Sequence, residues 1–382
     1  MMPSRTSKKD WLDSWHVVPD GSQTYGFLDG IRGIAILLVV ACHLLYVNPQ
    51  ASPGMLFLFG IFGAGTFGVT IFFALSGFLI SLPFWKGKAR GTSPDLKRYA
   101  SRRFWKIVPP LALSLLIVTP VYIYFHGDKN DYLKTAVQWL CGYAFIFPVS
   151  GKLNPVMWSL IVEVHFYILL PIFFLLLRKS SYRNTLLILS LGFLVLPVGA
   201  RQIYEACGIG FSLHPLIRVN FPSKLDAFSI GILMAGLHAR NMVPPLLARL
   251  APLGFLGIAI ALVWTSHLGL TPGTPKVLTE INNLIILASS GLLLAFIANP
   301  SAAGQWLLDN RLLRWFGLVS YEWYLFHQAA FFFTWNFLGN AGGDPKIYAA
   351  RILIPAVGSL IVASTIYRFF SVPILRATRG HD

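Results

Sequence analysis

The sequence predicts an all-α fold, a polytopic membrane bundle of about ten transmembrane helices, on three observations. Of the 382 residues, 55% are hydrophobic and only 12% are charged, about half the charged fraction of a typical soluble domain. The mean hydropathy is +0.63, and apolar runs long enough to cross a bilayer recur along the chain. Basic residues gather in the short loops between these runs.

The excess of basic charge fits a membrane better than a nucleic acid. The chain has 31 Lys+Arg against 15 Asp+Glu, a net charge of +16. Such a balance can indicate nucleic acid, but loops of this kind suit anionic lipid and the positive-inside rule. We therefore expect a multi-pass protein of the cell's inner (cytoplasmic) membrane, with the lipid bilayer and no nucleic acid among its partners.

Ten apolar runs have about the length needed to cross 30 Å of hydrocarbon. They fall at residues 28–47, 55–82, 107–125, 157–177, 184–200, 224–239, 249–269, 282–298, 316–337 and 347–370. An eleventh segment, 132–149, is weaker because it holds Gln138, Gly142 and Pro148. No cleavage-site pattern follows the first run, so we expect it to be a retained helix and not a signal peptide.

Loop charge sets the expected topology. With a cytoplasmic N-terminus and no crossing by 132–149, most of the 31 lysines and arginines lie inside, including those of the loop 83–106. If 132–149 crossed, Arg178, Lys179 and Arg183 would move outside, against the rule. We therefore predict that both termini are cytoplasmic and that 126–156 is an outer re-entrant or interfacial segment.

The expected organisation is one membrane domain with two short tails. Residues 1–27 would be a cytoplasmic N-terminal tail, 28–370 the membrane domain and 371–382 a cytoplasmic C-terminal tail. The three cysteines are scattered and show no metal-ligand spacing, so we expect neither a disulfide framework nor a metal site.

Ionisable residues inside apolar runs are candidates for function because charge in hydrocarbon is costly. In the first run, Arg32 and His43 are eleven residues apart, about three turns plus 20°, so they share one helix face about 16 Å apart along the axis. Asp29 falls about 40° from His43 on that face. The plainer alternative is an anchoring arginine and a core histidine with a satisfied hydrogen bond.

The fourth run carries a carboxylate, Glu163, about 9 Å below its outer end and at a depth similar to His43. A carboxylate that reaches an imidazole fixes its tautomer and raises its basicity. Ser159 and Tyr167 share the face of Glu163 by i,i+4 spacing, whereas His165 points away. Glu163 could instead pair with another buried donor.

A basic cluster precedes Pro109. Arg102 and Arg103 lie four and three residues before Lys106, and the three cations suit a polyanion such as a nucleotide phosphate. A plain positive-inside anchor is the alternative.

Two further candidates are His327, in the middle of the ninth run, and Asp226, near the outer end of the sixth. His327 could equally be a core histidine with a satisfied hydrogen bond, and the neighbouring Lys224 could neutralise Asp226.

Four stretches resemble signatures of the acyltransferase 3 family of membrane-bound O-acyltransferases. They are FLDGIRGIAILLVVACH (27–43), GVTIFFALSGFLI (68–80), RRFWKIVPP (102–110) and WSLIVEVHFYILLP (158–171). KLDAFSIGIL (224–233) and SYEWYLFH (320–327) match more weakly. The departures are Lys106, where the family usually has arginine, and Glu322, where we expected a small or apolar residue.

The resemblance implies a ten-helix enzyme that uses cytoplasmic acyl-CoA, commonly acetyl-CoA, to acylate a hydroxyl of a sugar, glycan or similar acceptor. On this hypothesis the basic cluster binds the phosphates of CoA and Arg32 guides the thioester arm. His43, oriented by Glu163, would be the general base, and an acyl-histidine intermediate stays open.

Two other functions compete with the enzyme. A transporter of a glycan or small metabolite would place buried charges along a path through the membrane and would usually show repeat symmetry, and neither is visible here. A non-catalytic assembly or sensor protein would tolerate replacement of Arg32 and His43.

Overall fold

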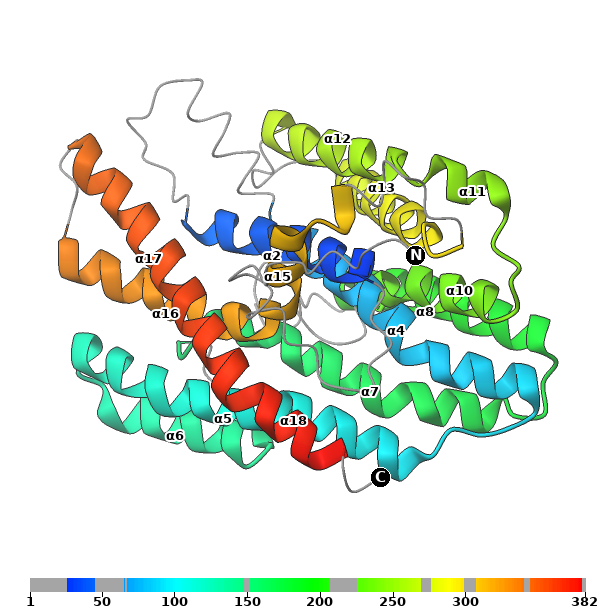
Figure 1. Ribbon diagram of the computed structural model, residues 1–382, viewed down its shortest axis with the longest axis horizontal. Coiled ribbons are helices and arrows are strands. Elements are labelled where there is room, and N and C mark those ends of the chain that lie inside the picture. Colours follow the sequence, from blue (N-terminus) through cyan, green and yellow to red (C-terminus); the bar gives the residue numbers. More distant parts are fainter. Residues whose placement is uncertain are drawn as a thin grey trace, which may run out of the picture.

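The computed structural model describes residues 26–44, 65, 67–147, 152–206, 225–268, 276–298, 307–339 and 344–379. Within these ranges every regular element is a helix, and no strand occurs. The helices run mainly along the long axis of the molecule, with α2 (Gly26–Leu44) near the centre of the view (Figure 1).

Six helical segments are long and apolar enough to cross a membrane. They are built from α2, α4 (Phe67–Arg90), α5 (Leu96–His126), α7 (Trp158–Leu176), α8 (Tyr182–Ala206) and α17 (Pro345–Ile366), the last continuing through η5 (Tyr367–Ser371) into α18 (Val372–Arg379). The remaining helices are α6 (Lys129–Leu140), η2 (Tyr143–Phe145), η3 (Pro155–Met157), α10 (Asp226–Ala239), α11 (Pro245–Leu250), α12 (Leu253–Leu268), α13 (Lys276–Ala295), α15 (Arg311–Leu318) and α16 (Ser320–Leu338).

The all-helical fold is therefore confirmed for the described residues. Each of the ten expected runs overlaps a helix, whereas the count of ten spans, the tails and the cytoplasmic placement of both termini stay predictions. Part of the expected C-terminal tail is helical, since α18 extends to Arg379.

The expected inner loop 83–106 is much shorter than predicted. Helix α4 continues through Pro83 to Arg90, and α5 already begins at Leu96. Asp95 caps α5, because its Oδ1 accepts a hydrogen bond from the backbone N–H of Arg98 at 3.1 Å. The basic cluster therefore lies on the first turns of a helix and not in a loop.

Helix α6 does not have the length to cross a bilayer. Its 12 residues span about 18 Å, well short of about 30 Å of hydrocarbon. Tyr132, Ala136 and Trp139 are buried in a second apolar core shared with α5 and α16, while Val137 and Leu140 are exposed. This amphipathic arrangement agrees with a segment that lies along the bundle.

Helix α2 is held in the centre by backbone-to-backbone contact. A Cβ atom at Gly30 would lie 1.7 Å from the carbonyl oxygen of Leu308, and one at Gly317 would lie 1.9 Å from that of Asp29. Small residues of this kind let membrane helices approach closely. The contact fixes the segment of α2 that carries Asp29 and Arg32 against α15.

Candidate active site

A cavity of about 280 Å³ opens between α2, α4, α5, α7 and the α15–α16 turn. We call it the inner cavity, after the predicted topology. Its functional side chains combine three cations, one carboxylate and several hydroxyls. They are Arg32, Arg103, Lys106, Glu163, Ser76, Ser159, Tyr167, Ser320, Tyr321 and Tyr324.

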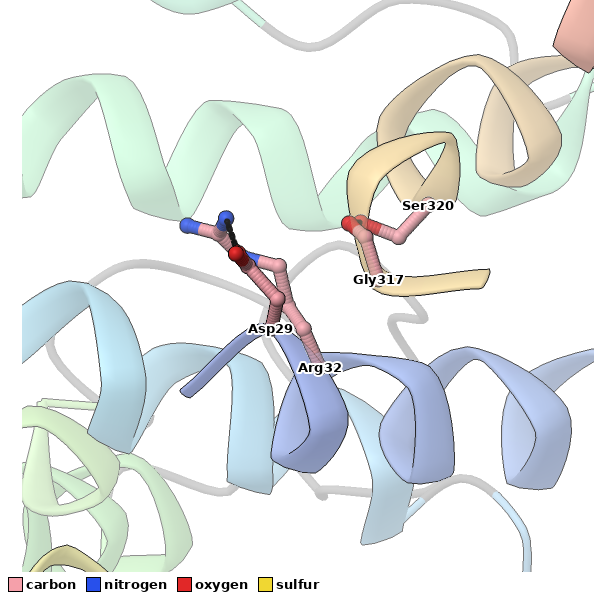
Figure 2. Close-up of polar contacts among 4 residues, drawn as sticks. All are labelled: Asp29, Arg32, Gly317 and Ser320. Atoms are coloured by element: carbon pink, nitrogen blue, oxygen red, sulfur yellow. Dashed lines mark hydrogen bonds and ion pairs between the residues drawn. The ribbon is translucent and has the colours of Figure 1, made fainter. Parts of the chain in front are cut away.

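Arg32 enters the cavity from α2 and is held by Asp29. The Nη1 atom of Arg32 lies 3.4 Å from Oδ1 of Asp29, and only 10% of the Asp29 side chain is exposed. Figure 2 shows both side chains rising from α2 beside the turn of Gly317 and Ser320, where the Ser320 hydroxyl donates to the Gly317 carbonyl at 2.8 Å. Asp29 therefore positions Arg32.

Glu163 accepts hydrogen bonds from two hydroxyls. The Ser76 hydroxyl donates to Oε1 of Glu163 at 2.7 Å, and the Tyr167 hydroxyl donates to the same oxygen. The guanidinium of Arg103 lies 5.5 Å from the centroid of the Tyr167 ring. The carboxylate is thus fixed inside a cationic cavity.

The expected contact between Glu163 and His43 is not formed. The described partners of Glu163 are Ser76 and Tyr167, while those of His43 are on α2 and α16. The similar positions of Glu163 and His43 along their helices did not bring them together, because other side chains fill the space around each of them. Leu153, Asn154, Val156 and Met157 are each at most 3% exposed, so the chain before α7 is packed inside the protein.

His43 pairs instead with His327. Nε2 of His327 lies 3.3 Å from Nδ1 of His43, and the ring centroids are 5.0 Å apart at 62°. Nδ1 of His43 also lies 2.8 Å from the carbonyl oxygen of Val39, and Nδ1 of His327 lies 2.8 Å from that of Tyr324. The two imidazoles are therefore coupled across α2 and α16.

These contacts assign the tautomers. A carbonyl oxygen only accepts hydrogen bonds, so Nδ1 carries the proton in each ring and Nε2 keeps a lone pair in the neutral imidazole. The Nδ1–H of His43 points between Val39 O and Nε2 of His327. Nε2 of His43 is left as a basic atom, which is what a general base requires.

Other sequence-predicted residues separate into two groups. Ser159, Tyr167, Arg103 and Lys106 line the inner cavity with Arg32 and Glu163. Arg102 is exposed and does not line it. Asp226 lies in the first turn of α10, where its Oδ1 accepts from the Ala227 N–H at 2.9 Å, and it also lies outside the lining.

Sequence reasoning missed Tyr324. Its hydroxyl lies 2.7 Å from Oγ of Ser159 in the cavity wall, and its ring centroid lies 5.8 Å from that of His327. Tyr324 thus connects the inner cavity with the histidine pair. The available signal was its spacing of three residues before His327 on one helix.

Glu322 is buried, at 3% exposure, although an apolar residue was expected there. The Ser371 hydroxyl donates to its Oε1 at 2.6 Å, so this carboxyl ties α16 to η5. Within the described ranges, no three or more His, Cys, Asp or Glu side chains are grouped to hold a metal ion.

Comparisons with known proteins place the chain among acyltransferases. The model of a family described as an acyltransferase domain matches residues 25–368. The peptidoglycan O-acetyltransferase OatA of Listeria monocytogenes is 26% identical over 364 residues, covering 91% of this chain and 55% of the relative. The putative peptidoglycan O-acetyltransferase YrhL of Bacillus subtilis is 25% identical, covering 91% and 54%. The O-acetyltransferase OatA of Staphylococcus aureus is 24% identical, covering 91% and 56%.

The chain spans about half the length of the curated relatives it matches. No solved structure matches it. None of these three relatives is named as a transporter.

Proposed function

Because the chain belongs to the acyltransferase domain family, we propose that this transferase moves an acyl group, commonly acetyl, from cytoplasmic acyl-CoA to a hydroxyl of a glycan. The names of its relatives make peptidoglycan a candidate acceptor. The observation that carries the proposal is the coupled histidine pair beside a cationic cavity.

The inner cavity supplies the donor site. Arg103 and Lys106 lie on the first turns of α5, where they meet the phosphates of CoA by charge and hydrogen bonding. A volume of about 280 Å³ is at the low end for ligand pockets, so it suits the thioester arm and not the whole donor. Arg32, fixed by Asp29, directs that arm along α2.

His43 acts as the general base. Its Nε2 takes the proton of the acceptor hydroxyl as the oxygen attacks the thioester carbonyl carbon. The carbon–sulfur bond then breaks, and the CoA thiolate leaves with the proton that the imidazolium returns. The products are an ester and free CoA. His327 accepts from the Nδ1–H of His43 and holds the ring in this tautomer.

The test is acetyl transfer by the purified full chain in lipid nanodiscs. Acetyl-CoA and a peptidoglycan disaccharide are supplied, and free thiol and acetylated product are measured. His43→Ala should lower the rate of transfer by about 10²–10⁴-fold, the usual contribution of a general base.

The matched control is His165→Gln. His165 is also a helix histidine bonded to a carbonyl, with Nε2 2.6 Å from the oxygen of Phe145 in η2, but it is not part of the His43–His327 pair. This variant should keep its activity. Normal turnover by His43→Ala would refute the assignment of the base.

A further inference from the structure

A second cavity, of about 540 Å³, has lining residues near the C-terminal ends of α5 and α16 and in the first part of α17. These helix ends lie at the left in Figure 1. We call it the outer cavity, and the chain before α7 completes its lining. The lining residues that matter here are Tyr122, His126, Lys152, Gln328, Phe332 and Arg351.

Helix α16 is a wall of both cavities. Ser320, Tyr321 and Tyr324 line the inner cavity, and Gln328 begins the outer lining one residue after His327. Along α16, His327 lies between the residues that line the two cavities, although neither His43 nor His327 is itself part of a lining. A ligand in the outer cavity would contact the segment of α16 that follows His327.

One wall of the outer cavity is aromatic. The ring of Phe332 stacks on that of Tyr122 at a centroid distance of 4.5 Å and on that of His126 at 4.9 Å. Flat apolar ring faces of this kind pack well against the C–H faces of a sugar ring. A pyranose is thus a suitable occupant.

Two buried polar atoms in the lining have no hydrogen-bond partner. They are Oε1 of Gln328, an acceptor, and Nε of Arg351, a donor. The guanidinium of Arg351 is held 3.8 Å above the ring of Trp335. A ligand that satisfies both atoms must offer a hydroxyl to Gln328 and an anionic or acceptor oxygen to Arg351.

The charge of the lining also favours an anionic ligand. Lys152 lies at the cavity, and its Nζ is 3.3 Å from Oδ2 of Asp131. This hydrogen bond and the charge of Asp131 raise the pKa of Lys152, so the amine stays cationic at neutral pH. The described lining contains no aspartate or glutamate.

We propose that the outer cavity is the acceptor site and that it selects an acidic sugar, a pyranose bearing hydroxyls and a carboxylate or phosphate. The inference rests on the proposed function, and it adds the place and the charge of the acceptor. A phospholipid headgroup also supplies an anion for Arg351, and some headgroups carry a hydroxyl as well. The stacked rings of Tyr122, His126 and Phe332 in the lining favour the sugar.

The experiment measures binding and not turnover. The full chain in phosphatidylcholine nanodiscs is titrated with the acidic disaccharide of N-acetylglucosamine and N-acetylmuramic acid, and with its neutral methyl ester. The acid should bind about tenfold more tightly than the ester, since an anionic hydrogen bond to Arg351 is lost in the ester. Arg351→Met and Gln328→Ala should each weaken binding of the acid by about tenfold.

The matched control is Arg240→Met, because Arg240 also stacks on an aromatic ring, 4.1 Å from Tyr182, outside both cavities. It should bind the acid as the wild type does. Equal binding by Arg351→Met and Arg240→Met would overturn the acceptor site. Displacement of the acid by glycerol 1-phosphate at equal concentration would also overturn it, in favour of a lipid headgroup. Binding of the acid without acetyl transfer would refute the proposed function and leave the site standing.

Discussion

His43 and His327 each use one ring nitrogen to bond a carbonyl of their own helix. This anchors both rings at a fixed rotation and leaves the second nitrogen of each free for proton transfer or acceptance. The arrangement differs from a carboxylate–histidine pair, because the side chain that meets His43 from another helix is the imidazole of His327, whereas Glu163 is bonded to Ser76 and Tyr167.

The cations of α5 have unequal roles in donor binding. Arg103 lines the inner cavity and its Nε is buried without a hydrogen-bond partner, whereas Arg102 is exposed. Arg103→Met should raise the KM for acetyl-CoA about tenfold or more, the effect of a lost charge-assisted hydrogen bond. Arg102→Met should raise it about threefold or less.

Lys97→Met is the control for loss of one positive charge from α5, since Lys97 is exposed on the first turn. It should leave the KM unchanged. Equal effects of Arg102→Met and Arg103→Met would contradict the geometry of the inner cavity.

At the residue scale the sequence pointed to six of the ten functional side chains of the inner cavity. Arg32, Glu163, Ser159 and Tyr167 were singled out because polar groups in apolar runs are conspicuous, and Arg103 and Lys106 because they belong to a basic cluster. The partner of His43 was not identified. Helical phase relates residues of one helix only. Which residues of other helices meet Glu163 and His43 depends on the tertiary packing, which the sequence pattern does not show.

At the scale of elements, the contact between α2 and α15 sets the position of Arg32. Gly317→Ala would place a methyl group 1.9 Å from the carbonyl oxygen of Asp29, so the helices must separate. We expect a loss of about 1–3 kcal/mol of stability, as for overpacking in general, with a lower unfolding temperature by intrinsic fluorescence in detergent.

Gly192→Ala provides the control. Gly192 is inside α8 and nothing lies within 4 Å of the position of its Cβ, so the change should be neutral or stabilise by up to about 1 kcal/mol through helix propensity. A Gly317→Ala protein as stable as Gly192→Ala would show that α2 and α15 are not in close contact.

Element boundaries were less predictable than element type. Long apolar runs indicate membrane helices because the bilayer requires them. The start of α5 was missed because the cap at Asp95 lies in a polar stretch that looks like a loop. The turn between α15 and α16 and the π-helical segment Tyr367–Ser371 leave no trace in hydropathy, since both are set by packing.

At the scale of the whole molecule, the two cavities are lined by different stretches of α5, the inner one in its first half and the outer one near its end, and the proposed function uses the first for the donor and the second for the acceptor. The predicted topology places the α6 region outside. A variant whose only cysteine is Cys141, which is exposed just after α6, should react with an impermeant thiol reagent added to intact cells.

Arg90→Cys, made as the only cysteine at the exposed end of α4, is the inner reporter and should react only after the cells are made permeable. The opposite pattern would invert the topology. Cys207, which the sequence also places outside, lies beyond the described residues and is replaced in both variants.

Because different segments of α16 line the two cavities, the lining of each cavity can be altered separately by mutation. The segment after His327 contributes only to the outer lining, and the segment before it only to the inner one. Replacement of residues 328–336 by those of a relative should therefore change the lining of the outer cavity and leave the lining of the inner cavity unchanged.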